Sequence, residues 1–152
     1  MNNSPAPINV IMAAIPEPGN DRNRTIAETW MGWREAGANE PLRLFLKDGG
    51  YLDDGNPKRF ENDGVASGRH FDPSFSIAAA YQMEEAIAQK GHASTYTHAL
   101  AVVLLESGIP NNFEDEWWMF THATPEQRSK AALVAWAKVQ NHLAAEGVKD
   151  AN

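Results

Sequence analysis

The chain has 152 residues, of which 13 are Lys or Arg and 20 are Asp or Glu, so its formal net charge is −7. A hydrophobic content of 43% is enough to build a core, and the length suits one domain, so a wholly disordered chain is excluded. The negative balance argues against binding to polymeric nucleic acid, which gains affinity from clustered Lys and Arg. The lack of cysteine excludes disulfides, a cysteine nucleophile and thiolate metal sites.

The apolar segments of the sequence are all short. None approaches the roughly 18 to 20 residues of a membrane span. The first apolar run, residues 10–15, precedes the first cationic residue, Arg22, whereas a secretory signal begins with cations. We therefore expect a soluble, cytoplasmic protein with no membrane partner.

The first third of the chain predicts two strands and a helix. Residues 10–15 are apolar and are closed by the proline-rich turn 16–20, which indicates a short strand. Residues 24–36 predict a helix, because apolar side chains recur at spacings of three and four: Ile26, Ala27, Trp30, Met31 and Trp33. Residues 42–47 alternate Leu with other residues, which is typical of a half-buried strand. Residues 48–70 show no period and predict a long irregular loop.

The remainder of the chain predicts two helices flanking two strands. Asp72 or Ser74 is expected to cap a helix that runs to Lys90. Residues 98–105 and 117–122 are rich in Val, Leu and aromatic residues, which favours two strands. Thr124 and Gln127 have the spacing of a capping box, which predicts a final helix from Pro125 to about Ala145.

The predicted order intersperses strands and helices without strict alternation. Such an order favours an antiparallel or mixed sheet covered by about three helices over a doubly wound parallel sheet. We therefore predict an α+β fold, a compact α-β-α layered sandwich. It would occupy residues 24–147 as a single domain, after an N-terminal leader at 1–23 and before a C-terminal tail at 148–152.

Motifs for catalysis and for metal or cofactor binding are absent from the sequence. The five histidines show none of the spacings typical of metal ligands, and no phosphate-binding glycine motif occurs. We therefore expect no metal and no cofactor. Ser67 lies three residues before His70, which leaves open a small hydrolase, although a Gly/Ser turn explains the same residues.

A mixture of cations and aromatic rings follows the predicted strand at 42–47 and contrasts with the acidic remainder. Guanidinium groups pair with phosphates and aromatic rings stack on bases, so this mixture suits a small anionic, nucleotide-type ligand. The alternative is a set of ordinary solubilising charges. The candidate ligand-binding residues are Arg43, Lys47, Tyr51, Lys58, Arg59, Phe60, Arg69 and His70.

The adjacent residues Trp117 and Trp118 form a candidate interface. In the predicted strand their side chains would point to opposite faces, so one of them must be covered by a helix, a partner subunit or a ligand. An exposed tryptophan is a natural anchor for association. We therefore expect a homo-oligomer that uses this position.

Three segments together resemble small bacteriophage proteins of the phage ABA-sandwich type. They read IAETWMGW at 26–33, FDPSFSIAAA at 71–80 and ATPEQRSKAAL at 123–133. The resemblance implies an α-β-α domain and a phage or prophage origin. It implies an accessory protein rather than an enzyme, and it transfers no functional residue. Small phage proteins of similar size sequester nucleotide immune signals made by bacterial defence systems.

Together these observations predict a non-enzymatic phage or prophage accessory protein. It would bind and sequester a small nucleotide-derived anion, such as a host immune signal, and so act in counter-defence. The first alternative is a protein-binding module that inhibits or modulates a host or phage protein, with residues 114–118 as the contact. The second alternative is a small hydrolase.

Overall fold

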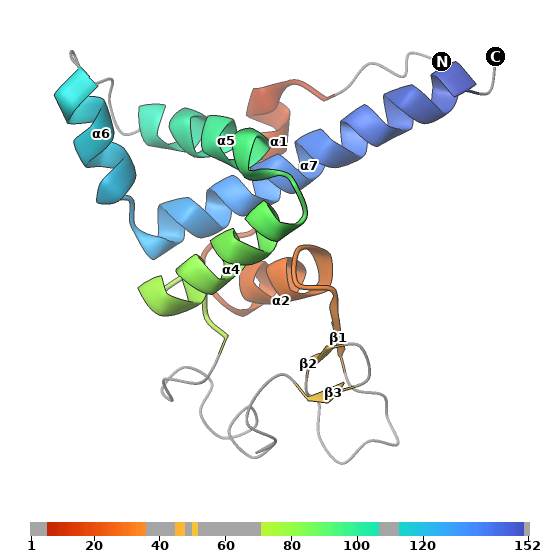
Figure 1. Cartoon of the computed structure of the whole chain (residues 1–152), viewed down its shortest axis with the longest axis horizontal. Coiled ribbons are helices and arrows are strands. Elements are labelled where there is room, and N and C mark those ends of the chain that lie inside the picture. Colours follow the sequence, from red (N-terminus) through yellow and green to blue (C-terminus); the bar gives the residue numbers. More distant parts are fainter. Residues whose placement is uncertain (1–5, 36–44, 48–49, 52–70, 107–112, 151–152) are drawn as a thin grey trace.

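The computed structural model describes residues 6–35, 45–47, 50–51, 71–106 and 113–150 (Figure 1). Within these ranges the regular structure is almost entirely helical. The helices are α1 (Ile8–Ala14), α2 (Asn20–Thr29), α4 (Ile77–Gln89), α5 (Ala93–Leu105), α6 (Phe113–Thr121) and α7 (Pro125–Asp150). The long helix α7 runs through the molecule, and α1, α2, α4 and α5 all pack against it (Figure 1).

Three very short strands form a small ribbon beside α2. β1 (Trp33–Glu35), β2 (Phe45–Lys47) and β3 (Gly50–Tyr51) pair in that order, and both pairings are antiparallel. The ribbon lies at the edge of the helices rather than between two helical layers (Figure 1). The predicted α+β sandwich is therefore wrong for the described residues, where helices pack on helices.

Three segments expected to be strands are helices. Residues 10–15 belong largely to α1, residues 98–105 to α5, and residues 117–121 to α6. The buried side chains of α5 show why its helical form is stable, because they recur at spacings of three and four and make one continuous stripe. These residues are Tyr96, Ala99, Leu100, Val103 and Leu104.

The middle of α7 lies at the centre of the core. Five consecutive residues, Ala131–Ala135, are buried, and five residues exceed one helical turn, so this segment is covered on every side. Most of them are alanine, whose small side chain lets neighbouring helices approach closely. Trp30 of α2 is fully buried against α7 and donates its indole N–H to the Ala132 carbonyl at 2.7 Å.

A buried polar cluster joins the start of α2 to the segment before α4. Asn23 donates its side-chain amide to Asp72 Oδ1 at 2.6 Å, and its own Oδ1 accepts from the backbone N–H and the hydroxyl of Ser74. The expectation that Asp72 or Ser74 caps the helix is wrong, because Ser76 takes that place and accepts from the Ala79 N–H.

The capping box at the start of α7 is confirmed. The Gln127 N–H donates to Thr124 Oγ1 at 3.1 Å, and the Thr124 N–H donates to Gln127 Oε1 at 2.9 Å. The helix continues beyond the expected end near Ala145 to Asp150. In the described part of the chain, none of the helices combines the length and apolar content needed to cross a membrane.

Replacing Trp30 with Phe tests the indole hydrogen bond while keeping an aromatic ring in the core. We expect the free energy of unfolding to fall by about 1–3 kcal/mol, because the bond is lost and the smaller ring leaves a gap. Urea unfolding followed by circular dichroism measures the loss. The control is Trp136→Phe at the half-buried ring that meets Trp30 edge-on at 5.1 Å. Equal losses in the two variants would contradict this role for the Trp30 N–H.

Candidate functional site

The ligand-binding residues expected from the sequence fall outside the part of the chain whose side chains the structure describes. Arg43, Lys58, Arg59, Phe60, Arg69 and His70 lie outside the described residues, as does Ser67. Lys47 and Tyr51 are placed only by their backbone, in β2 and β3, where Lys47 pairs with Gly50. The anion site therefore stays a prediction.

The two adjacent tryptophans are exposed on the described surface. Trp117 is 60% exposed and Trp118 is 59% exposed. The predicted strand would have sent them to opposite faces, but in α6 successive residues are separated by about 100°. Both indoles can therefore reach solvent from the same helix. We call Trp117, Trp118 and His122 the tryptophan surface.

His122 orders this surface from one end. Its imidazole stacks on the Trp118 ring with the ring centroids 3.6 Å apart and the planes inclined by 16°. Its Nδ1 lies 3.0 Å from the Trp118 carbonyl oxygen. The Thr121 hydroxyl donates to the carbonyls of Trp117 and Trp118. Trp118 thus has one face covered by His122 and still presents most of its area to solvent.

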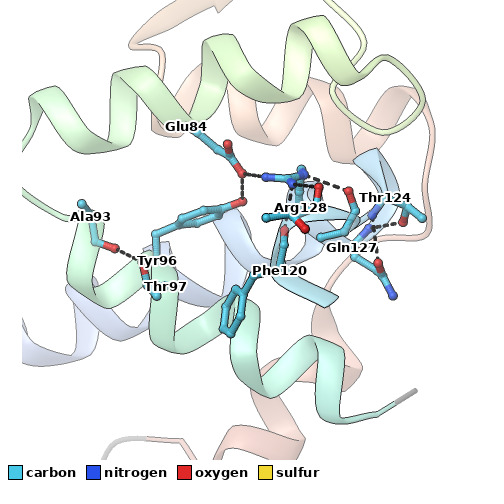
Figure 2. Close-up of polar contacts among 10 residues, drawn as sticks. Glu84, Ala93, Tyr96, Thr97, Phe120, Thr124, Gln127 and Arg128 are labelled. Atoms are coloured by element: carbon cyan, nitrogen blue, oxygen red, sulfur yellow. Dashed lines mark hydrogen bonds and ion pairs between the residues drawn. The ribbon is translucent and has the colours of Figure 1, made fainter. Parts of the chain in front are cut away.

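Arg128 of α7 fixes the end of α6 that carries His122. Its guanidinium is buried and donates to the carbonyls of Phe120, Thr121 and Ala123, at 3.0, 3.5 and 2.9 Å respectively (Figure 2). The last carbonyls of a helix have no partner within the helix. Arg128 supplies that partner from another helix, which sets where α6 ends.

Glu84 of α4 balances the charge of Arg128. One carboxylate oxygen, Oε1, accepts from Arg128 Nη1 at 2.5 Å and from the Tyr96 hydroxyl of α5 at 2.5 Å (Figure 2). The Tyr81 ring lies 5.1 Å from the guanidinium carbon and adds a cation–π contact. Four helices therefore meet at one guanidinium group.

The environment of Tyr96 disfavours its ionised form. Burial raises the pKa of the Tyr96 phenol well above its ordinary value, and the negative charge and hydrogen bond of Glu84 raise it further. Arg128 opposes this rise only in part. The phenol therefore keeps its proton and remains a hydrogen-bond donor to Glu84.

Sequence reasoning missed the network that positions the tryptophan surface. Glu84 and Glu85 are adjacent acids in the sequence, but only Glu85 is exposed. Glu84 and Arg128 are 44 residues apart in the chain, and no local pattern links positions at that separation. Within the described ranges, no group of three or more His, Cys, Asp or Glu residues could hold a metal ion.

Comparison with known proteins gives no family assignment: no family model, curated protein or solved structure matches the chain. The resemblance to phage ABA-sandwich proteins therefore stays a prediction. The α-β-α layering that it implied differs from the helical fold observed.

Replacing Arg128 with Met should cost about 2–4 kcal/mol of unfolding free energy, because it leaves Glu84 without its counter-charge and the α6 carbonyls without a donor. Denaturant unfolding measures this loss. Lys130→Met is the matched control, since Lys130 pairs with Glu106 in a more exposed position and should cost less than about 1 kcal/mol. A similar cost for both variants would contradict the anchoring role.

The raised pKa of Tyr96 predicts a loss of stability at alkaline pH. Above about pH 10 the unfolded chain releases the Tyr96 proton while the folded chain retains it, so unfolding becomes easier as the pH rises. Tyr96→Phe should remove about 1.4 kcal/mol per pH unit from this dependence. Denaturant unfolding at several pH values from about 9 to about 11.5, a range that spans the pKa of a free phenol, measures how the free energy of unfolding changes with pH. Tyr81→Phe is the control. An unchanged slope in Tyr96→Phe would refute the assignment.

Proposed function

We propose that this chain is a protein-binding module and that the tryptophan surface of α6 is its contact site. The observation that carries the proposal is the exposure of two adjacent indoles, at 60% and 59%. Tryptophan is enriched among the few residues that supply most of the energy of protein association. Exposed apolar residues that are adjacent, unlike ones scattered singly, are typical of an interaction site.

The surface is ordered before any partner binds, which favours a binding role over incidental exposure. Trp118 is stacked on His122, and the end of α6 is held by Arg128. Side chains that are already held lose less conformational entropy when they bind. A partner would therefore meet a preformed aromatic platform.

Charge favours a different protein over a second copy of this chain. Residues 114–116 are Glu-Asp-Glu, directly before the tryptophans, and the chain carries a net charge of −7. A two-fold symmetric interface brings the same patch of both copies together, so it would concentrate like charges. The fitting partner has an apolar pocket for the indoles, surrounded by Lys and Arg.

Affinity capture with the purified chain from the lysate of its host cell tests the proposal. The wild type should retain a partner that the double variant Trp117→Ala/Trp118→Ala does not. Titration of the purified partner should show at least about a tenfold weaker affinity for the double variant, because tryptophan anchors dominate such interfaces. Leu143→Ala is the control, since Leu143 is a 53% exposed apolar residue of α7.

Two outcomes would overturn this proposal. One is a partner that binds the double variant as tightly as the wild type. The other is a wild-type dimer in sedimentation that the double variant converts to monomer. That second outcome would assign the surface to a second copy of the chain, the homo-oligomer expected from the sequence.

A further inference from the structure

A groove of about 880 Å³ opens between α1, α5 and the first turns of α7, and it shares no residue with the tryptophan surface. The apolar part of its lining, which we call the apolar floor, consists of Ile8, Met12, Ala13, Ile15, Val102 and Val103. Helix α1 buries only Ile11, so its other apolar residues are incompletely covered. Ile8 itself is 37% exposed. The groove therefore offers apolar area that the fold leaves accessible.

Both cationic groups that line the groove are already engaged. Arg22 is buried and donates to the Pro16 carbonyl, the Glu126 carbonyl and the Ser129 hydroxyl, at 2.8, 3.0 and 3.2 Å. Lys130 Nζ lies 3.1 Å from Glu106 Oε2. Lys130 is paired with a carboxylate, and Arg22 gives the donors described above to neutral oxygens while keeping its positive charge.

The groove keeps two carboxylates without an ion-pair partner among the described residues. These belong to Glu17 and Glu126, which are both exposed. Burial lowers the pKa of Arg22, and the charges of Glu126 and Glu17 oppose that change. This coupling places both carboxylates near the Arg22 end of the groove. Counted together, the charged residues that line the groove are Glu17, Glu106 and Glu126 against Arg22 and Lys130, so the lining has a net negative charge.

We propose that this groove binds a basic amphipathic helix of another protein. The apolar face of that helix would cover the floor, and its Lys or Arg side chains would reach Glu17 and Glu126. Docking an amphipathic helix into an apolar groove is a common mode of peptide recognition, and charges at the rim give it selectivity. This site is independent of the contact proposed for α6.

Fluorescence anisotropy with a labelled amphipathic peptide of Leu and Lys tests the charge complementarity. Glu17→Gln/Glu126→Gln should weaken binding about five- to tenfold, because two favourable charge contacts are lost while the side-chain size is kept. Glu28→Gln/Glu85→Gln is the matched control, since both residues are exposed and lie outside the groove. It removes the same number of negative charges and should retain wild-type affinity.

Ala13→Trp tests the groove itself. Ala13 is exposed and lines the groove, so a large side chain there should fill the space, abolish peptide binding and leave the circular dichroism spectrum unchanged. Trp117→Ala/Trp118→Ala should bind the peptide like the wild type, which separates this test from that of the α6 surface.

Three results would overturn the proposal. The first is equal weakening in both glutamine pairs, which indicates attraction by overall charge. The second is undiminished binding to folded Ala13→Trp. The third is a fatty carboxylate that binds the groove more tightly than the peptide, which assigns the site to an anionic amphiphile.

Discussion

The burial of the middle of α7 on every side is the constraint on which the rest of the fold depends. Ala131–Ala135 can be enclosed only if several helices approach α7 closely, and alanine permits that approach. Trp30 then fills the space beside these small residues, and its N–H is paired with the Ala132 carbonyl. The large and small side chains are complementary, so neither α2 nor α7 is well packed without the other.

Buried polar side chains determine where the outer segments attach to this core. Asn23 joins α2 to the segment before α4, and Arg22 joins it to the first turns of α7. Arg128 does the same for the end of α6. Each of these groups would be costly to bury without partners. Their hydrogen bonds therefore select one arrangement among the many that apolar packing alone would allow.

A local sequence signal identified the start of α7, whereas the apolar patterns did not distinguish strands from helices. Thr124 and Gln127 predicted the start of α7 because a capping box is formed by residues three positions apart. The apolar run at 98–105 was misread because a short buried run fits either state. Every residue from 99 to 105 is apolar, so the sequence itself shows no period there, and the helical spacing is seen only in which of these residues are buried.

The candidate site was predictable only in part, because its geometry depends on contacts that are distant in the chain. The adjacent tryptophans were recognised as a candidate interface from their sequence alone, but their predicted strand conformation was wrong. Aromatic residues have high strand propensity, which is easily overridden by tertiary contacts. The contact that overrides it here, from Arg128 to the α6 carbonyls, joins separate helices and leaves no periodic signal in the sequence.

The contacts of Arg128 couple the end of α6 to the other helices. Detaching α6 would take the Phe120 and Thr121 carbonyls away from the Arg128 guanidinium, so local opening of this helix loses hydrogen bonds to a charged group. The tryptophan surface is therefore presented only by the folded state. Any protein that binds there also raises the melting temperature of the entire helical body, because it draws the folding equilibrium toward the native chain by mass action.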